Sequence, residues 1–481
     1  KATKNIVKRG VTELVTPGVS YRDTISDQNS NNFLAAVFFG ENNIGVSFLD
    51  NSTGEFLVTE GKVDYIDKLL QSFSPSEIIF EKSKRREFED KFGDGFFTQM
   101  IDDWVFTEDY SEELLLNQFS TKSLKGFGIE KLEAGTISAG AVLHYLKETH
   151  HHLTKHISTI SRIEQEKYVW MDRFTIRNLE LFYSSNENAK TLIDILDFTL
   201  SAMGSRMIKR WVALPLKEKK QIDRRLEIVQ FILNNKDFKD VLEEHIKSIG
   251  DLERLISKVS TSRVSPRECN QLKIALHSIH PIKQSCENSN NNNIKIIGEQ
   301  LNACKTISER IENTITDNPP ALVNKGNIIK KGVNTELDEL RQLSKSGKDY
   351  LQQILERETE RTGIPSLKIS FNNVFGYYLE VRNIHKEKVP EEWIRKQTLV
   401  SAERYITEEL KEYESKILSA EGKILELETR LYQDLVSSLS EYVVAIQTNS
   451  QLISQLDCFY SFATIAKNNK YHKATISENT N

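Results

Sequence analysis

The chain has 481 residues, of which 38% are hydrophobic and 28% are charged. This length predicts roughly two to four domains, and the composition is typical of a soluble globular protein and excludes a largely disordered one. The formal net charge of −5 excludes a globally basic nucleic-acid-binding protein, so any contact with nucleic acid must come from a local patch.

The first residues, from Asn5 to Ser26, contain Thr16-Pro17-Gly18-Val19, which is typical of a loop or the entry to a linker. The chain begins with Lys1 rather than with methionine, so we expect a piece excised from a longer protein. No apolar run reaches membrane-spanning length, and no signal peptide begins at Lys1. We therefore expect a cytoplasmic protein that makes no contact with a membrane.

From Asn32 onward, short apolar segments alternate with turns rich in Gly, Asn and Asp. We predict strands at residues 33–39, 44–49, 55–59, 77–80 and 104–106, and helices at residues 63–73, 111–119 and 137–149. The order β-β-β-α-β-α predicts an α/β layer arrangement of RNase H-like type.

An RNase H-like domain is compatible with a metal-dependent nuclease, which needs carboxylates gathered around its metal ions. The first predicted strand carries no acidic residue. Asp50, Glu55 and Glu77 fall at strand ends, where acids are ordinary turn and surface residues. We therefore keep a nuclease only as an alternative, and we expect neither a metal site nor a catalytic residue in this chain.

A histidine run, His150 to His152, is followed by His156, and histidines four residues apart share a helix face that suits a metal ion. No acidic or cysteine partner lies nearby in the sequence, and the run falls between two predicted domains. A solvated linker helix is therefore favoured over a metal site.

From Met171 to about Asn313 the pattern is almost entirely helical, with Pro215 ending one helix. Arg206, Lys209 and Arg210 lie on neighbouring turns of that helix. They form either an anion-binding face or a set of solvated or salt-bridged side chains, and the second alternative is favoured.

The cysteines lack C-x-x-C spacing, which favours buried or inert thiols in a reducing compartment over zinc or disulfides. They are Cys269, Cys286, Cys304 and Cys458.

Two long helical patterns flank a short β-patterned segment. The first runs from a Thr335 cap to a stop at Gly363 and Pro365. The second, from about Thr407 to about Val444, would be roughly 55 Å long, and its apolar seam needs a partner helix. Between them, residues 367–371 and 377–381 alternate as the strands of a hairpin. An antiparallel helix pair with a small domain at its end is the simplest prediction.

Several sequence blocks, in their order and spacing, resemble the MutS family of DNA mismatch-repair proteins over nearly the whole chain. In the helical middle and the first long helix the blocks are Arg177-Asn178-Leu179-Glu180-Leu181, Met203-Gly204-Ser205-Arg206-Met207, Arg210-Trp211 and Glu336-Leu337-Asp338-Glu339-Leu340-Arg341. Around the β-patterned segment they are Phe375-Gly376-Tyr377-Tyr378, Arg395-Lys396-Gln397-Thr398-Leu399, Ala402-Glu403-Arg404-Tyr405 and Glu409-Leu410-Lys411-Glu412-Tyr413-Glu414.

The resemblance implies an α/β RNase H-like connector domain, then a mostly α-helical core and lever with long antiparallel helices and an inserted small β-rich clamp domain. The implied parts are a tail of the mismatch-binding domain with its linker (1–30), the connector (31–150), the core with the first lever helix (151–362), the clamp (363–415) and the returning lever helix with core (416–481). Of the mismatch-binding domain only Val7-Lys8-Arg9 and Val15-Thr16-Pro17-Gly18 remain, so the family's mismatch-wedging Phe-x-Glu is not expected here.

The same resemblance sets the expected cofactors and partners. No G-x-x-x-x-G-K-[ST] loop occurs before Asn481, so we expect no cofactor and no enzymatic activity in this chain, with ATP and Mg²⁺ acting in the full-length protein. Double-stranded DNA is the implied partner. The full-length protein is expected to be a homodimer and to bind a downstream mismatch-repair protein through connector and core. The levers would transmit the ATP state to the clamp.

A clamp that holds duplex DNA without selecting sequence needs phosphate contacts. The candidate residues precede the return helix, whose N-terminal dipole favours anions. They are Arg395, Lys396, Gln397, Thr398, Ser401 and Arg404.

The alternative role for each candidate is support of the fold. Arg404 would then pair with Glu403 or Glu408, Thr398 would cap the helix, and Tyr377 and Tyr378 are expected to pack in the hairpin. Family clamps often carry Lys-Asn where this chain has Val400 and Ser401, which removes one cation. A structural coiled-coil arm protein remains a second alternative, and salt-sensitive DNA binding would distinguish it from a clamp.

Overall fold

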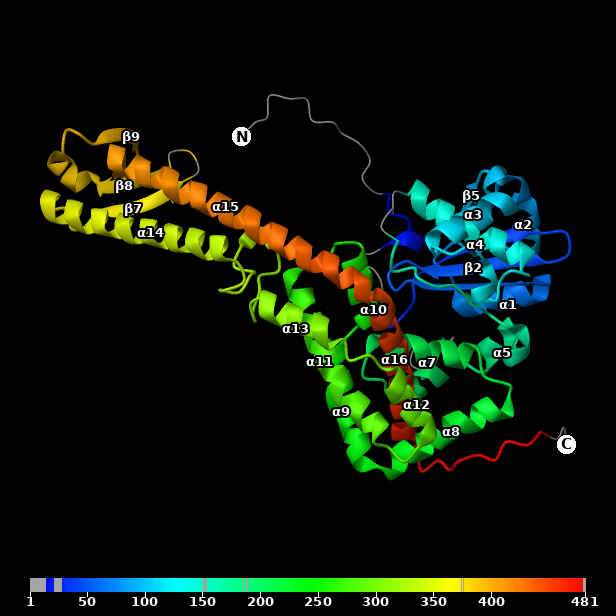
Figure 1. Ribbon diagram of the computed structural model, residues 1–481. Coiled ribbons are helices and arrows are strands. Elements are labelled where there is room, and N and C mark those ends of the chain that lie inside the picture. The colour runs from blue at the N-terminus through cyan, green and yellow to red at the C-terminus, as the bar shows by residue number, and fades with distance from the viewer. Residues whose placement is uncertain are drawn as a thin grey trace. The chain divides into compact units, whose positions relative to one another are not determined.

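The chain divides into two compact units in a computed structural model, which describes residues 14–20, 28–149, 154–184, 186, 189–372, 374 and 376–478. Unit 1 comprises Lys1–Val264, Gln271–Glu309 and Val436–Asn481, and unit 2 comprises Ser265–Asn270 and Arg310–Leu435. Both units are coloured by residue number in Figure 1. Unit 2 is therefore built mainly from one continuous insertion in the sequence of unit 1.

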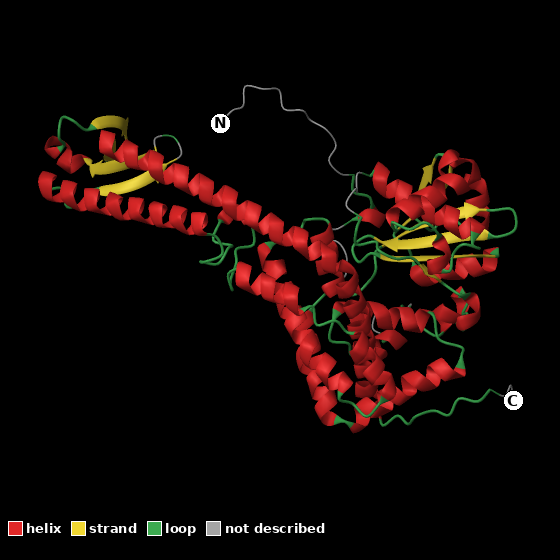
Figure 2. Ribbon diagram, viewed as in Figure 1, coloured by secondary structure: helices red, strands yellow, loops and turns green. Residues whose placement is uncertain are grey.

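A mixed β-sheet forms the first part of unit 1 (Figure 2). The strands placed in it by the described residues are β1 (Phe33–Phe39), β2 (Ile44–Asp50), β3 (Glu55–Gly61), β4 (Glu77–Glu81), β5 (Thr98–Ile101) and β6 (Ser161–Arg162). Their spatial order is β5-β4-β1-β2-β3-β6. Strands β1, β2 and β3 are antiparallel neighbours, whereas β4, β5 and β6 each run parallel to the strand beside them. The predicted α/β class is confirmed, and the RNase H-like topology stays a prediction.

Helices cover both faces of this sheet, which explains why β1 is apolar along its whole length. These helices are α1 (Val63–Phe73), α2 (Arg85–Phe92), α3 (Glu108–Gln118) and α4 (Glu133–Glu148). Leu34 and Ala36 of β1 pack in one buried cluster with α4, while Phe33, Ala35 and Val37 pack in the other cluster with α1. Successive side chains of a strand point to opposite faces, so one strand serves two cores.

One expectation for this region is wrong. Residues 104–106 do not form a strand, because Asp103–Val105 is a 3-10 turn and the edge strand beside β4 is β5. Strand β5 is partly exposed and lacks the apolar alternation that marks a strand in sequence. The expected linker entry at residues 16–19 contains a 3-10 turn, Pro17–Val19, in which Gly18 and Val19 are buried.

The middle and the end of the chain are helical, as predicted. The helices are α5 (Arg173–Asn178), α6 (Leu192–Leu196), α7 (Ala202–Ala213), α8 (Lys219–Asn234), α9 (Lys236–Ile249), α10 (Leu252–Ser260), α11 (Pro266–Glu287), α12 (Asn292–Gln300), α13 (Lys305–Thr314) and α16 (Val443–Asn469). Helix α16 is buried along most of its length and packs against α7, α8, α9 and α10. Its Asp457 accepts hydrogen bonds from the backbone N–H groups of Leu200 and Ser201 and from the Ser201 hydroxyl, which fixes the start of α7.

Unit 2 contains two long helices and a small antiparallel sheet. The helices are α14 (Thr335–Thr362) and α15 (Glu408–Leu439), and the strands are β7 (Lys368–Asn372), β8 (Gly376–Arg382), β9 (Ile394–Thr398) and β10 (Ala402–Ile406). The strand order is β7-β8-β10-β9. The predicted hairpin, β7 with β8, is confirmed. Strands β9 and β10 were not predicted as strands.

The ends of the long helices differ slightly from prediction. Asn334, rather than Thr335, caps α14, since its side chain accepts a hydrogen bond from the Leu337 N–H. Gly363 ends this helix in the left-handed region, with φ of 59°. Helix α15 ends at Leu439 rather than near Val444, and a 3-10 turn, Ser440–Tyr442, separates it from α16.

Helices α14 and α15 lie side by side and antiparallel (Figure 1). Four contacts define their pairing in opposite chain directions: Arg341 with Glu428, Lys348 with Glu421, Tyr350 with Tyr413, and Arg357 with Glu409. The Tyr350 and Tyr413 rings stack with their centroids 4.0 Å apart.

Among the helices that the structure describes, none combines the length and apolar character needed to cross a membrane.

Candidate nucleic-acid interface

The two faces of the unit 2 sheet differ in chemistry. Ile369, Leu379 and Val381 belong to a buried cluster with residues of α14 and α15. Residues paired across strands point to the same face, and the register aligns Lys368 with Glu380, Glu380 with Arg404, and Arg404 with Gln397. Together with Arg382, two residues after Glu380 on β8, these side chains lie on the face turned away from the cluster, as does the buried Tyr378. We call Lys368, Glu380, Arg382, Gln397 and Arg404 the outer sheet face.

Arg404 is held firmly on this outer sheet face. Its Nε lies 3.2 Å from a carboxylate oxygen of Glu380, and one of its terminal nitrogens donates to Gln397 at 2.9 Å. The guanidinium also lies over the ring of buried Tyr378, 4.5 Å from the centroid. The sequence-based alternative that Arg404 pairs with Glu403 or Glu408 is wrong, because the β8–β10 register places Glu380 opposite it. The predicted packing role of Tyr378 is confirmed.

Arg395 is tied to a different acid, Glu403, which is only 2% exposed. Glu403 accepts a hydrogen bond from the Tyr405 hydroxyl and pairs with Lys386 at 3.1 Å and with Arg395 at 3.3 Å. The hydrogen bond from Tyr405, followed by the contact with Lys386, lowers the pKa of the Glu403 carboxyl. Arg395 and Lys386 therefore share one negative charge and keep a net positive charge at this edge of the sheet.

The remaining predicted residues are exposed around the β9–β10 turn. Lys396 is exposed on β9, and in the described part of the chain it has no ion-pair partner. Thr398 and Ser401 are also exposed. Thr398 does not cap α15, because the hydroxyl of Thr407 accepts the hydrogen bond from the Leu410 N–H.

The N-terminus of α15 offers little to an anion. Glu408 and Glu409 occupy its first turn and already complement the helix dipole. The six predicted residues thus fall into three places: Gln397 and Arg404 on the outer sheet face, Arg395 and Lys396 along β9, and Thr398 with Ser401 at the turn. Their role in binding DNA stays a prediction.

Sequence reasoning did not single out Lys368 and Arg382. Both are exposed, and neither has an ion pair within the residues described. The alternation of the hairpin could have predicted their position. Lys368 precedes Ile369 and Arg382 follows Val381, and both apolar neighbours point into the core, so the two basic side chains point to the opposite face.

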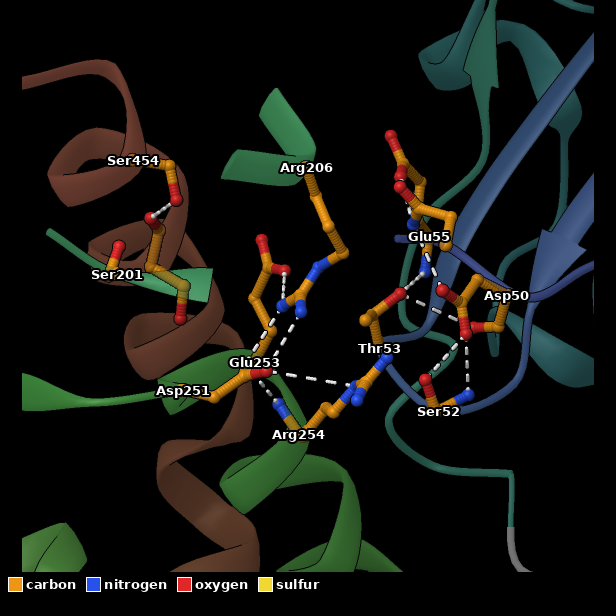
Figure 3. Close-up of polar contacts among 12 residues, drawn as sticks. Asp50, Ser52, Thr53, Glu55, Ser201, Arg206, Asp251, Glu253, Arg254 and Ser454 are labelled. Carbon is orange, nitrogen blue, oxygen red and sulfur yellow. Dashed lines mark hydrogen bonds and ion pairs between the residues drawn. The ribbon is translucent and has the colours of Figure 1, made fainter. Parts of the chain in front are cut away.

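The three basic residues of α7 are partnered rather than free, and the salt-bridged form of the favoured alternative is confirmed for Arg206 and Arg210. Figure 3 shows Arg206 directed at Asp251 and Glu253, at 2.8 Å and 2.7 Å. Arg210 pairs with Glu55, and Lys209 donates to the backbone oxygen of Asn29 at 2.8 Å. None of them forms a free anion-binding face of its own.

Two of the acids considered for a nuclease, Asp50 and Glu77, are buried rather than surface residues, which corrects the prediction for these two. Asp50 is fully buried and Glu77 is 1% exposed. Asp50 accepts from the N–H and hydroxyl of Ser52, and Glu77 accepts from the Gly18 N–H and the Tyr145 hydroxyl.

Asp50 and Glu77 also cannot share a metal ion. Asp50 pairs with Phe33 and Glu77 with Leu34, two neighbours on β1 that point to opposite faces of the sheet. A nuclease site is therefore not favoured by the geometry of Asp50 and Glu77.

His156 is fully buried instead of lying on a solvated helix, so that expectation is wrong at this residue. Its Nε2 lies 2.8 Å from the backbone oxygen of Asn51. His150, His151 and His152 lie outside the described residues, as do Val7-Lys8-Arg9 and Phe375. The four cysteines are free and buried, which confirms the prediction of buried thiols, and burial raises the pKa of Cys269 and Cys286 to about 12.

The fold and this cationic sheet face define a multidomain α/β and helical protein with a candidate nucleic-acid-binding surface. Residues 174–463 match the family model described as MutS domain III, and residues 32–158 match the one described as MutS domain II. The chain belongs to the MutS family.

Curated relatives agree with this assignment. The DNA mismatch repair protein MutS of Bacteroides fragilis (strain YCH46) is 57% identical over 479 residues, which cover 100% of this chain and 56% of the relative. The protein of the same description from Cytophaga hutchinsonii is 53% identical over 478 residues, covering 99% of this chain and 56% of the relative. The chain thus spans about half the length of the curated relatives it matches.

Proposed function

We propose that this chain acts in DNA mismatch repair by holding the backbone of duplex DNA with the outer sheet face and the adjoining residues of β9. One observation carries the proposal: Lys368, Arg382 and Arg404 share a sheet face with a single acid, Glu380, in a chain whose net charge is −5. The family membership and the printed descriptions of the relatives support DNA as the partner.

Cationic side chains on a flat sheet face suit phosphate oxygens better than base edges. Arg404 is held in place by Glu380, Gln397 and Tyr378, so little side-chain entropy is lost when it meets a phosphate. Lys368, Arg382 and Lys396 supply charge that their surroundings leave uncompensated. This arrangement grips DNA without selecting its sequence.

Helices α14 and α15 would act as levers, since the contacts that join them favour movement as one element. In the longer proteins of the family, we propose that these levers respond to ATP and Mg²⁺ bound elsewhere. We further propose a homodimer as the working form. Residues of the connector and core, at 31–150 and beyond, would present a surface to a downstream repair protein.

The test is fluorescence anisotropy of a labelled duplex titrated with the 481-residue chain at several salt concentrations. We expect salt-dependent binding and weaker binding by the triple variant Lys368→Gln, Arg382→Gln, Lys396→Gln. The slope of log affinity against log salt should fall by about 0.9 for each phosphate that the variant no longer neutralises. Lys125→Gln, an exposed lysine in unit 1, is the matched control and should leave both quantities unchanged.

Three results would count against the proposal. Binding that does not depend on salt would remove phosphate contact as its basis. Equal affinity and equal salt slope for the triple variant and the parent chain would place any DNA site elsewhere. Absence of binding would favour a structural arm protein instead.

A further inference from the structure

A cavity of about 840 Å³ lies within unit 1, separate from the sheet of unit 2. Its wall is formed by β3 and β6 of the mixed sheet and by helices α7, α8 and α16. The volume is in the range of small-molecule sites and too small for a DNA duplex. Four arginines and two aromatic residues in its lining carry the argument below: Arg162, Tyr168, Arg210, Trp211, Arg224 and Arg225.

Four arginines line this cavity against two acids, Glu55 and Glu253. Both acids already have cationic partners: Glu55 pairs with Arg210, and Glu253 pairs with Arg206 at 2.7 Å (Figure 3). The side chains of Arg162, Arg224 and Arg225 form neither an ion pair nor a hydrogen bond with any residue that the structure describes. The cavity therefore holds an excess of positive charge in a chain that is negative overall.

Arg225 is fixed at the wall of the cavity. Its guanidinium carbon lies 3.6 Å from the centre of the Trp211 ring, and Phe459 packs against the same ring at 5.3 Å. Burial, with a contribution from the charge of Arg210, lowers the pKa of Arg225 to about 10. The arginine still carries its charge at neutral pH, so it is a partly buried cation without a counterion. Partial burial of an unpaired charge costs free energy because the charge loses contact with water, and a bound anion would offset that cost.

We propose that this cavity binds a small anion that carries two adjacent phosphate groups. The guanidinium fork matches the geometry of phosphate oxygens, and three unpartnered arginines match more than one negative charge. A free inorganic diphosphate and the diphosphate of a nucleotide share this chemistry. Arg225, stacked on Trp211, is the anchor, and Arg224 and Arg162 stand at the more exposed side of the cavity.

Isothermal titration calorimetry of the 481-residue chain in phosphate-free buffer tests the proposal, with inorganic pyrophosphate, ADP and adenosine as probes. We expect pyrophosphate and ADP to bind and adenosine to give no heat. Arg225→Gln and Arg224→Gln should each weaken the binding of pyrophosphate about tenfold or more. Arg86→Gln, an exposed arginine on α2, is the matched control and should bind as the parent chain does.

Arg224 is exposed, so Arg224→Gln keeps the test decisive if Arg225→Gln fails to fold. Equal affinities for pyrophosphate and ADP would identify the inorganic anion as a sufficient ligand. Tighter binding of ADP would identify the nucleotide.

No binding of pyrophosphate at millimolar concentration would overturn the proposal, and so would binding that both arginine variants leave unchanged. The triple variant at Lys368, Arg382 and Lys396 should bind pyrophosphate normally. The proposal for the cavity and the proposal for the DNA interface are therefore tested independently.

Discussion

At the scale of single residues, His156 has the clearest consequence for stability. Its side chain is fully buried and its Nε2 faces the carbonyl oxygen of Asn51, so Nε2–H is the donor and the ring is neutral. Nδ1 has no hydrogen-bond partner in the part of the chain that the structure describes. Burial lowers the pKa of this imidazole to about 4. Protonation of His156 therefore requires a buried charge or local unfolding.

We predict that His156 makes the stability of unit 1 fall as the pH drops. Between pH 6.5 and the folded pKa of about 4, the unfolded chain binds more protons than the folded chain. The stability is fully present above pH 6.5 and is lost progressively below it, by up to about 3 kcal/mol. Urea unfolding at pH 7.5 and pH 5 measures the loss for the parent chain and for His156→Gln, whose amide can replace the Nε2 donor.

His156→Gln should lose less stability than the parent chain between these two pH values. His472→Gln changes an exposed histidine and serves as the control, with a pH dependence equal to that of the parent. Equal pH dependence for His156→Gln and the parent would contradict the prediction.

At the scale of elements, the close approach of α14 and α15 depends on Gly347. A Cβ atom added at this position would lie 2.6 Å from Cγ1 of Ile417, closer than two carbon atoms tolerate. Ile417 is 1% exposed and belongs to the buried cluster of unit 2, so it has little room to move.

We predict that Gly347→Leu destabilises unit 2 by about 1 to 3 kcal/mol, because the side chain forces the two helices apart. Gly422→Ala is the matched helical glycine on α15, where a Cβ atom would meet nothing within 4 Å. That change should stabilise the unit by about 0.5 to 1 kcal/mol through the lower backbone entropy of the unfolded chain. Thermal unfolding followed by circular dichroism gives both values, and a Gly347→Leu protein as stable as the parent would refute the close approach.

At the scale of the whole molecule, the two compact units have separate hydrophobic clusters. Leu115 is fully buried in a cluster of unit 1, and Leu410 is fully buried in the cluster of unit 2. Replacing either leucine with alanine would weaken the packing of only one of these clusters. A separate core is what allows a unit to unfold as a cooperative transition of its own.

We predict two transitions in differential scanning calorimetry of the chain. Leu115→Ala should lower the midpoint of one transition and Leu410→Ala the midpoint of the other, each by several degrees, since such truncations cost about 2 to 5 kcal/mol. A single transition that both substitutions shift equally would show that the two units unfold together.

The sequence by itself determined the position of many strands and helices of this protein, because the periodicity of apolar residues depends on the local secondary structure. Short apolar segments between turns identified β1, β2 and β3, alternation identified the β7–β8 hairpin, and helical spacing identified α14 and α15. The family resemblance, carried by short blocks in order, was also available from sequence alone and is confirmed. Strands such as β5 and β9 escaped prediction because their partly exposed, polar residues pair at sheet edges and lack an apolar signal.

Only the tertiary structure decided which charges are free. Arg206 has no acid beside it on α7 and is neutralised by Asp251 and Glu253 from a distant part of the sequence, whereas Arg225 has Asp223 and Glu227 within two positions on α8 yet stacks on Trp211. The same holds for Arg404, whose partner Glu380 is 24 positions away in sequence and adjacent only through the β8–β10 register. Charge pairing depends on distances between elements that the chain brings together on folding, and periodicity along the sequence carries no record of those distances.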